Sequence, residues 1–336
     1  MSLIVEILAR GSQAHHGAPD FAIVPVPALD TAPGWRQDGY STAAILEQEK
    51  FMMVKRIVVG ALTCTLGCLM IALVIQAQQK PAAAPVKIYN TAKQKLMAGK
   101  QIFGGSIESS DPNIYCTMAN AGFDFTWIEM QHSTLTYEEA AKMIWACRGA
   151  AATPFIRVPD ATESDIQKAT DIGALGIIVP TVDTVEKAEA AVKWAKYPPV
   201  GRRSVGGGQH KALYGDDYRQ TANDNMVVVI MIETPIGVAN AEKIAAVPGI
   251  DVIFAASGDM ANFSGHKQGE PEYEALITRV HDVTLKAGLK LGGPQNWKNR
   301  PGYTFLQAPP EWMLIQTGAQ ANLGIVPATA GSPAAK

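Results

Sequence analysis

The sequence predicts an α/β protein that folds as a (β/α)8 TIM barrel, and two patterns support this fold class. From Ile88 onward, short apolar runs alternate with helical patterns, as expected when helices connect the strands of a parallel sheet. Residues 226–232 form an unbroken apolar run, which a strand buried on both faces needs. The competing fold is an open doubly wound sheet. That fold usually carries a glycine-rich turn after its first strand, and Gly104-Gly105 matches that turn poorly.

Strands are expected where apolar runs are bounded by turn residues, proline or a carboxylate. Pro180 ends the fourth strand and Glu233 follows the fifth. The expected strands are residues 102–107, 123–130, 154–158, 176–179, 226–232, 252–254, 289–291 and 312–316. Because the last strand is placed so late, little helix is expected after it.

Helices are expected between the strands, where apolar residues recur at helical spacing. Glu138 and Glu139 occupy the first turn of one helix, where the helix dipole favours negative charge. Pro248-Gly249 ends another, because proline lacks a donor and glycine tolerates positive φ. The expected helices are residues 91–98, 113–121, 136–146, 164–172, 184–195, 235–247 and 271–287. Residues 197–214, rich in glycine and proline, are expected to form a long loop.

The chain ahead of the barrel is expected to hold three further segments. Residues 1–52 show no sustained period and are expected to be a disordered extension. Residues 53–79 contain a basic pair and then the uncharged stretch 57–75, close to the ~20 residues that a membrane-spanning helix needs. They are expected to be a signal peptide, cleaved after Ala77, or a transmembrane anchor. Residues 80–90 are expected to be a linker, residues 91–325 the barrel domain and residues 326–336 a disordered tail.

Such a leader places the protein outside the cytoplasm, periplasmic or extracellular, or tethers it to a membrane. The net charge of −2 provides no basic field, so no nucleic-acid partner is expected. The four cysteines form no CxxC pair and no zinc-ligand spacing. Cys116 and Cys147 are interpreted as buried thiols in preference to the alternative, a disulfide in an exported protein.

Two carboxylates follow neighbouring strands of the predicted barrel. Glu233 ends the fifth strand, and Asp259 follows the sixth after Ser257 and Gly258. Parallel strands bring their carboxyl ends to one edge, where barrel active sites are built. Magnesium is typically held by one or two carboxylates, with water and substrate completing the shell. The pair therefore predicts a divalent-metal site, although Glu233 alone can cap the next helix and Asp259 alone can lie in a turn.

His132 and Arg157 also follow or end predicted strands, so barrel closure brings them to the same edge. The set suits proton abstraction next to a carbonyl: a cation stabilises the developing enolate, and a histidine can move the proton at neutral pH. An arginine can steady a carboxylate by bidentate hydrogen bonds. The alternatives are a structural histidine and an arginine that pairs with a structural acid such as Glu129.

Six motifs stand in order within residues 91–316: FDFTWIEMQH at 123–132, IRVP at 156–159, DIGA at 171–174, YPPVGRR at 197–203, MIET at 231–234 and VPGID at 247–251. Together they resemble the HpcH/HpaI family of metal-dependent class II 2-oxo-acid aldolases, with citrate lyase β-like proteins as cousins. The resemblance implies the phosphoenolpyruvate/pyruvate type of TIM barrel.

The resemblance implies a role for each matching residue. Glu233 and Asp259 would bind Mg²⁺, Mn²⁺ or Co²⁺, His132 would be the catalytic base and Arg157 would bind substrate. Asp171 would support the histidine of a neighbouring subunit, so a homo-oligomer is expected. Ser257 and the backbone at Gly258 would face the substrate carboxylate.

The implied activity is carbon-carbon lyase chemistry, in which a 4-hydroxy-2-oxo acid is cleaved to pyruvate and an aldehyde through a metal-stabilised enolate. Its partners would be a small 2-oxo acid and an aldehyde. The sequence departs from the family pattern at Glu129, Gln131, Met231 and residues 256–260. Two other readings therefore stay open: a citrate-lyase-like CoA-thioester lyase, and a non-catalytic exported barrel that binds a small oxo acid.

Overall fold

The structure is a computed structural model that describes residues 42–78 and 87–325. The chain divides into two compact units, residues 1–82 and 83–336, and each is described by itself. The expectations for residues 1–41, for most of the linker and for the tail at 326–336 lie outside the described residues.

The first unit contains one long helix, α2 (Thr42–Gln78). Residues 42–52 are therefore helical, where the sequence suggested a disordered extension. Among the residues whose side chains the structure describes, no helix has a stretch long and apolar enough to cross a membrane. The side chains of residues 71–78 are not among those described. The expected signal peptide or anchor at 53–79 thus receives no support from the structure.

The second unit is a closed barrel of parallel strands, in which each strand pairs with its neighbours in sequence and β8 closes onto β1. This confirms the predicted fold class. The strands are β1 (Ile102–Ile107), β2 (Phe125–Glu129), β3 (Thr153–Arg157), β4 (Gly176–Val179), β5 (Val227–Ile232), β6 (Val252–Ala255), β7 (Lys290–Pro294) and β8 (Tyr303–Pro310).

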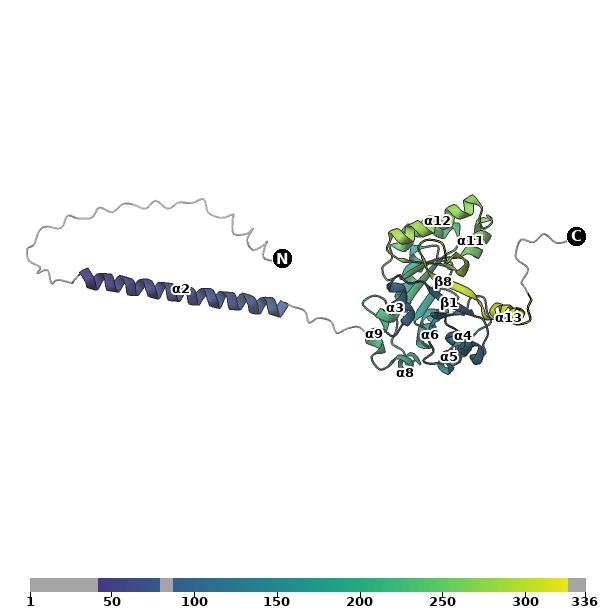
Figure 1. Cartoon of the computed structure of the whole chain (residues 1–336), viewed down its shortest axis with the longest axis horizontal. Coiled ribbons are helices and arrows are strands. Elements are labelled where there is room, and N and C mark those ends of the chain that lie inside the picture. The colour runs from purple at the N-terminus through teal and green to yellow at the C-terminus, as the bar shows by residue number, and fades with distance from the viewer. Residues whose placement is uncertain (1–41, 79–86, 326–336) are drawn as a thin grey trace, which may run out of the picture. The chain divides into compact units, whose positions relative to one another are not determined.

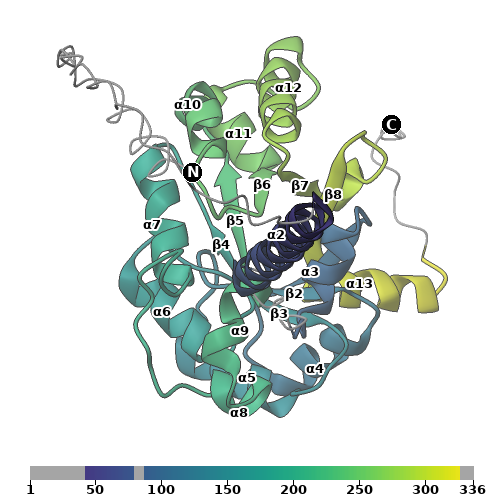
Figure 2. The same ribbon diagram turned by 90° about the vertical axis from the view of Figure 1, so that its left-hand side faces the viewer.

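Helices surround the barrel as a ring, which Figure 2 shows along the barrel. Some of them begin at a residue whose side chain caps the helix: Thr136, for example, forms a capping box with Glu139 at the start of α5. The helices are α3 (Thr91–Met97), α4 (Pro112–Asn120), α5 (Tyr137–Ala146), α6 (Glu163–Asp171), α7 (Val185–Ala195), α8 (His210–Tyr214), α9 (Tyr218–Asn225), α10 (Pro235–Ala245), α11 (Ser257–Ser264), α12 (Pro271–Lys286), the 3-10 turn η1 (Gln295–Trp297) and α13 (Glu311–Asn322).

Large aromatic side chains fill the barrel interior. Phe125, Phe155 and Phe305 are buried and lie with their ring centroids 4.5 to 6.1 Å apart. Glycines on neighbouring strands make room for them: a Cβ on Gly104 would lie 2.0 Å from the Phe125 ring, and one on Gly176 would lie 2.1 Å from the Phe155 ring. The interior is therefore packed, and the open space for a ligand lies at the ends of the strands.

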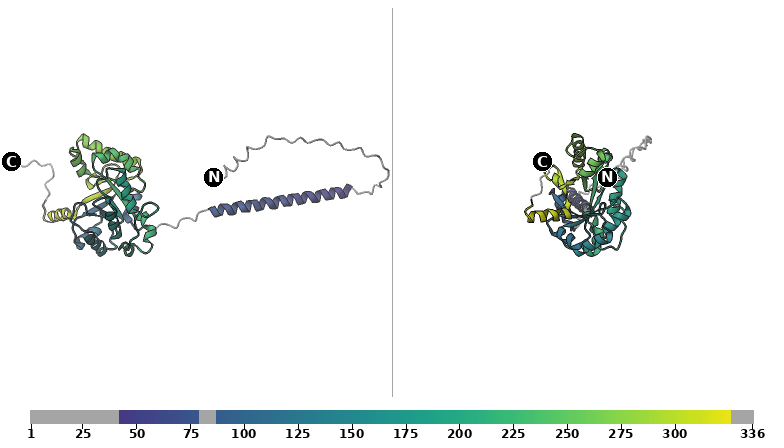
Figure 3. Two further views of the ribbon diagram at one scale, coloured as in Figure 1. Left: turned by 180° about the vertical axis from the view of Figure 1, so that it is seen from behind. Right: turned by 90° about the vertical axis from the view of Figure 1, so that its right-hand side faces the viewer.

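The eighth strand corrects the prediction. It runs over Tyr303–Pro310, and residues 312–316, expected as that strand, belong to helix α13. Trp312 and Ile315 are exposed on this helix, which projects from the barrel in Figures 1 and 3. Glu311 fixes where the helix begins, because its buried carboxylate accepts hydrogen bonds from the backbone N–H groups of Glu108 and Ser109. The expectation of little helix after the last strand was therefore also wrong.

The predicted loop at 197–214 is only partly irregular. It contains the cis peptide Pro198-Pro199 and ends in helix α8 (His210–Tyr214), which is followed by α9. The buried Arg203 holds this region to α6: its Nη2 lies 2.9 Å from Asp171 Oδ1, and its guanidinium stacks over the rings of Tyr197 and Tyr218.

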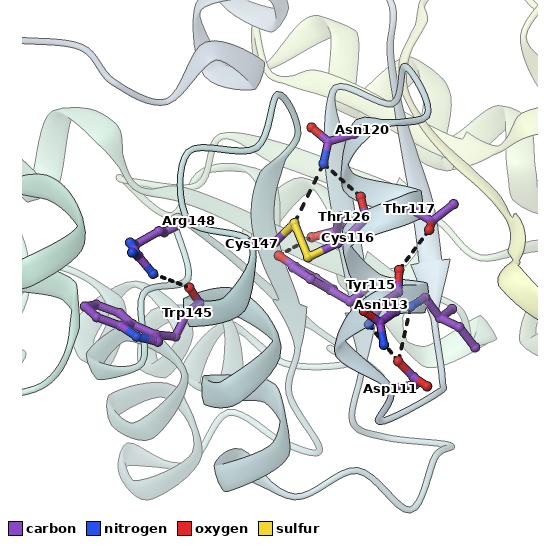
Figure 4. The surroundings of a disulfide bond; sticks show 11 residues. Asp111, Asn113, Tyr115, Cys116, Thr117, Asn120, Thr126, Trp145, Cys147 and Arg148 are labelled. Atoms are coloured by element: carbon purple, nitrogen blue, oxygen red, sulfur yellow. Dashed lines mark hydrogen bonds between the residues drawn. A yellow bond between two sulfur atoms is a disulfide. The ribbon is translucent and has the colours of Figure 1, made fainter.

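Cys116 and Cys147 form a disulfide, so the preference for buried thiols was wrong. Cys116 lies on α4 and Cys147 is the C-cap of α5, and the packing of these helices brings the two Cα atoms within 5.4 Å. Figure 4 shows Asn120 beside the bond, with its amide donating to Cys116 O and to Cys147 Sγ. The bond ties together two helices that flank β2.

The disulfide closes a loop of 31 residues, so its loss is expected to destabilise the chain. Chain-entropy reasoning gives a cost of about 3 to 4 kcal/mol for a loop of this size. Denaturant unfolding of the full chain should therefore show a lower unfolding free energy for Cys116→Ser and for Cys147→Ser, with no further loss in the double variant. Cys64→Ser, in the exposed part of α2, is the matched control and should unfold like the wild type.

Candidate active site

The charged residues singled out from the sequence gather at the carboxyl ends of the strands. Glu129 and Arg157 are the last residues of β2 and β3 and are partners in the strand register. Ile232 and Ala255 pair across β5 and β6, so these adjacent strands end at the same level; Glu233 is the next residue after β5, and Asp259 follows β6 in the first turn of α11. In a closed parallel barrel these positions form one rim.

A buried ion pair joins the first two of these residues. Arg157 Nη1 lies 3.2 Å from Glu129 Oε2, and both side chains are at least 93% buried, with exposed fractions of 7% and 5%. The pairing of Arg157 with a structural acid, one of the two readings of the sequence, is thus present. The same guanidinium also reaches toward the next acid, since Arg157 Nη2 lies 3.9 Å from Glu233 Oε2.

The Glu129 carboxylate also organises the segment that carries His132. Its Oε1 accepts hydrogen bonds from the backbone N–H groups of Gln131 at 2.8 Å and His132 at 3.1 Å. Its Oε2 accepts from Trp127 Nε1 at 3.1 Å in addition to Arg157. One buried acid therefore fixes both the arginine and the backbone of the candidate base.

Glu233 is held by Thr181, which follows β4. Both the backbone N–H and the Oγ1 of Thr181 donate to Glu233 Oε1. Thr181 has φ of 48°, the only left-handed non-glycine residue in the described part of the chain. This conformation is strained for a β-branched side chain, and such strain concentrates at functional sites. It turns the Thr181 backbone toward Glu233 and leaves Oε2 of that acid for another partner.

Several buried atoms at this rim lack a hydrogen-bond partner among the described residues: Glu233 Oε2, Arg157 Nε, Arg157 Nη2 and Gln131 Oε1. Buried polar atoms are almost always satisfied in native proteins, so such a group of exceptions needs an explanation. The free oxygen of Glu233 requires a cation or a donor, and the free nitrogens of Arg157 require an acceptor. A bound cation together with an anionic ligand satisfies both.

The donor set fits a divalent cation. Glu233 is 1% exposed, and the charge of Asp259 is near enough to raise the pKa of Glu233. No cluster of three or more His, Cys, Asp or Glu that could bind a metal occurs in residues 42–78 and 87–325. Two carboxylates are nevertheless sufficient for magnesium, because water and substrate supply the other ligands. The dipole of α11 also favours a negative group at the position of Asp259.

The remaining predicted residues are placed differently. His132 is exposed, and Glu129 holds its backbone just after the end of β2. Ser257 and Gly258 begin α11, and space is open around Gly258, where an added Cβ would meet nothing within 4 Å. Asp171 ends α6, which returns to the start of β4, so this residue lies at the opposite end of the barrel from His132 of the same chain.

The family model for HpcH/HpaI aldolase/citrate lyase matches residues 106–290, from the end of β1 to the first residue of β7, and the match includes Glu129, Glu233 and Asp259. The chain belongs to the HpcH/HpaI aldolase/citrate lyase family.

Two relatives of this HpcH/HpaI protein are named as aldolases. A hydroxypyruvate/pyruvate aldolase of Delftia acidovorans is 30% identical over 251 residues, 71% of this chain and 93% of the relative. A 2-dehydro-3,6-dideoxy-6-sulfogluconate aldolase of Pseudomonas putida is 33% identical over 209 residues, 59% of this chain and 82% of the relative. The crystal structure of a family protein from Burkholderia cenocepacia has a TM-score of 0.64 and 27% identity, covering 70% of this chain and all of that one. The HpcH/HpaI chain is thus an aldolase, a carbon-carbon lyase.

Two contacts of this HpcH/HpaI site could not be predicted from the sequence. Glu129 is predicted as a pairing partner for Arg157, but its hydrogen bonds to the backbone of residues 131 and 132 depend on how the chain turns after β2. Thr181 carries no signal at all, because a β-branched residue is the last choice for positive φ. Its contact with Glu233 spans 52 residues of sequence.

Burial raises the pKa of Glu233 above the ordinary glutamate value, an effect that Arg157 and Thr181 oppose and Asp259 reinforces. The ordinary value is ~4.3. Without metal, the native chain therefore retains a proton that the unfolded chain releases as the pH rises above that value. Stability is lost through this window as the pH increases.

Glu233→Gln removes this titration and keeps the acceptor for Thr181. In EDTA, the Tm of the full-length variant minus that of the wild type is expected to grow as the pH is raised from about 4 to 7. Differential scanning calorimetry across that range measures it, with Glu189→Gln on the exposed face of α7 as the control. A difference that is constant with pH would show that Glu233 is ionised normally.

Proposed function

We propose that the chain is a divalent-metal-dependent aldolase that cleaves a 4-hydroxy-2-oxo acid to pyruvate and an aldehyde. One observation supports this most strongly: an oxygen of buried Glu233 has no hydrogen-bond partner, lies 3.9 Å from Arg157 Nη2 and is close enough to Asp259 to feel its charge. This arrangement offers one place for a cation and another for an anionic oxygen, which is what a chelated 2-oxo acid presents. Family membership supports the reaction class.

Glu233 and Asp259 are the residues that would hold the cation, Mg²⁺, Mn²⁺ or Co²⁺. When bound, such a cation supplies positive charge next to the oxygen on which negative charge develops. Burial of Glu233 and its fixed hydrogen bonds to Thr181 orient one carboxylate oxygen toward the site before any ligand arrives. The carboxylate therefore needs little rearrangement when the cation and substrate bind. Electrostatic stabilisation is most effective at such a preorganised site.

Arg157 binds and orients the substrate. Its Nη1 donates a hydrogen bond to Glu129, and Nε and Nη2 stay available for a carboxylate or carbonyl oxygen. Because arginine presents a rigid pattern of donors, the ion pair with Glu129 also fixes the direction from which the substrate oxygen is held.

His132 moves the proton. It accepts the proton of the C4 hydroxyl as the C3–C4 bond breaks; the electron pair of that bond remains with the pyruvate fragment as its enolate, and the aldehyde leaves. A proton is then returned to C3, which gives the methyl group of pyruvate. Histidine suits both transfers because its imidazole can accept a proton and give it back.

Asp171 acts on the active site of a neighbouring copy of the chain, not on its own. Asp171 lies away from its own rim, and Arg203, at 2.9 Å, and Gln167, at 2.8 Å, hold its carboxylate in place. It keeps an exposed fraction of 22%, so a second copy can reach it. We therefore include a homo-oligomer in which Asp171 of one copy orients His132 of another.

Export of the chain, periplasmic or extracellular, or its tethering to a membrane, is also part of the proposal. The disulfide between Cys116 and Cys147 supports this placement, because disulfides persist in oxidising compartments and are rare in reducing ones.

The full-length chain with Mg²⁺, Mn²⁺ or Co²⁺ is expected to release pyruvate from 4-hydroxy-2-oxo acids, measured with a coupled lactate dehydrogenase assay. EDTA should abolish the release. His132→Ala should lower kcat by roughly a hundredfold or more, the usual contribution of a general base. Arg157→Lys should raise KM, since lysine keeps the charge and loses the two-pronged geometry.

Glu189→Gln is the control and should retain wild-type kinetics, because this residue lies on the outer face of α7. The proposal is wrong if no metal supports pyruvate release from any 4-hydroxy-2-oxo acid, or if His132→Ala keeps the wild-type kcat.

A further inference from the structure

A separate cavity opens at the same rim, on the side formed by β1, β2, β7 and β8. Its volume is about 370 Å³, within the range of small-molecule sites. The polar side chains that line it are Ser106, Glu108, Glu129, Gln295, Asn296 and Gln307. Glu129 connects this cavity to the cation site, because its carboxylate is paired with Arg157, which approaches Glu233.

The charge in this cavity is negative. No lysine, arginine or histidine lines it in the described part of the chain. Glu129 is neutralised by Arg157, and its oxygens are also occupied by Trp127 and by backbone N–H groups. Glu108 is exposed to the cavity, and its Oε2 accepts a hydrogen bond from Trp312 Nε1 at 3.1 Å. An anionic ligand here would meet a like charge and find no cation to pair with.

The hydrogen-bonding groups are neutral and serve as both donors and acceptors. Gln307 Nε2 lies 3.3 Å from Ser106 Oγ, which in turn donates to Ala308 O at 3.0 Å. Among the described residues, the side-chain oxygen of Gln307 and the side-chain amides of Gln295 and Asn296 form no hydrogen bond, so they are available to a ligand in the cavity. Hydroxyl groups also donate and accept, so they can pair with both the N–H and the carbonyl groups of these amides, whereas an ionised carboxylate can only accept.

We propose that this cavity receives the aldehyde portion of the substrate and selects a neutral, hydroxylated aldehyde over one that carries a carboxylate. The inference rests on the proposed aldolase function and specifies its substrate class. Anionic aldehydes are disfavoured because Glu108 repels them. Unsubstituted alkyl aldehydes are disfavoured because they cannot form hydrogen bonds with the amides of the cavity.

The structure also shows what holds Glu108 in place. Its backbone N–H donates to the buried carboxylate of Glu311, and its side chain accepts from Trp312. Both partners belong to the start of α13, and Met313 of the same helix lines the cavity. The C-terminal helix therefore positions the specificity residue.

The test uses the full-length chain with Mn²⁺ in the condensation direction, with pyruvate and one of three aldehydes. Glyceraldehyde is neutral and hydroxylated, succinic semialdehyde is anionic, and butanal is neutral and apolar. We expect kcat/KM to be highest for glyceraldehyde, and at least roughly tenfold higher than for succinic semialdehyde, as expected when buried polar groups are left unmatched.

Glu108→Arg is expected to raise the ratio of kcat/KM for succinic semialdehyde to that for glyceraldehyde by roughly tenfold or more. Glu189→Arg, a charge reversal of the same size on the outer face of α7, should leave that ratio unchanged. The wild-type ranking of the three aldehydes is an independent test if the Glu108 variant does not fold.

NMR can monitor the exchange of the pyruvate methyl protons with D₂O. This measurement distinguishes a failure of the cavity assignment from a failure of the aldolase function on which it rests. The exchange needs the cation and the base but no aldehyde. If no exchange occurs, the proposed aldolase function is overturned and this inference with it. If exchange occurs but succinic semialdehyde is the preferred aldehyde, or Glu108→Arg leaves the ratio unchanged, only the assignment of the cavity is overturned.

Discussion

A single buried guanidinium links the parts of the rim. Arg157 is hydrogen bonded to Glu129 on the adjacent strand, and its Nη2 lies 3.9 Å from Glu233 Oε2. Two acids from different strands therefore share the positive charge of one arginine. Buried charges are costly unless they have close partners, and one guanidinium cannot neutralise Glu129, Glu233 and Asp259 together. Burial, reinforced by the charge of Asp259, raises the pKa of Glu233. The proposed cation would balance the negative charge that Arg157 leaves uncompensated. The chemistry proposed for the chain depends on this imbalance.

The rest of the barrel preserves that arrangement. Interlocked aromatic rings and facing glycines fill the interior, so the strand ends cannot shift independently. Thr181 and Glu129 then position individual atoms, one by a strained backbone and the other by binding the backbone of residues 131 and 132. Helix α13 adds Glu311, which holds the segment after β1. Rigidity at the rim therefore comes from hydrogen bonds between loops that are distant in sequence, supported by a packed interior.

The sequence was sufficient for the barrel and for the position of most charged residues, because both follow from local patterns. Apolar runs mark the first seven strands, and a residue at the end of a parallel strand must lie at the rim. The failures share a physical cause, which is dependence on distant contacts. The apolar run after Glu311 resembles a strand until the bonds of Glu311 to residues 108 and 109 are known. The disulfide depends on how α4 packs on α5, and the φ of Thr181 depends on Glu233.

The most direct test is isothermal titration calorimetry of Mn²⁺ binding to the full-length, metal-free chain. It tests whether Glu233 and Asp259 bind one metal ion together. The arrangement of the two carboxylates requires one Mn²⁺ per chain, with binding at least roughly tenfold weaker in Glu233→Gln and in Asp259→Asn, since each variant loses one charged ligand. Glu189→Gln should bind like the wild type. Wild-type affinity in both carboxylate variants would contradict the idea that these two acids share a cation.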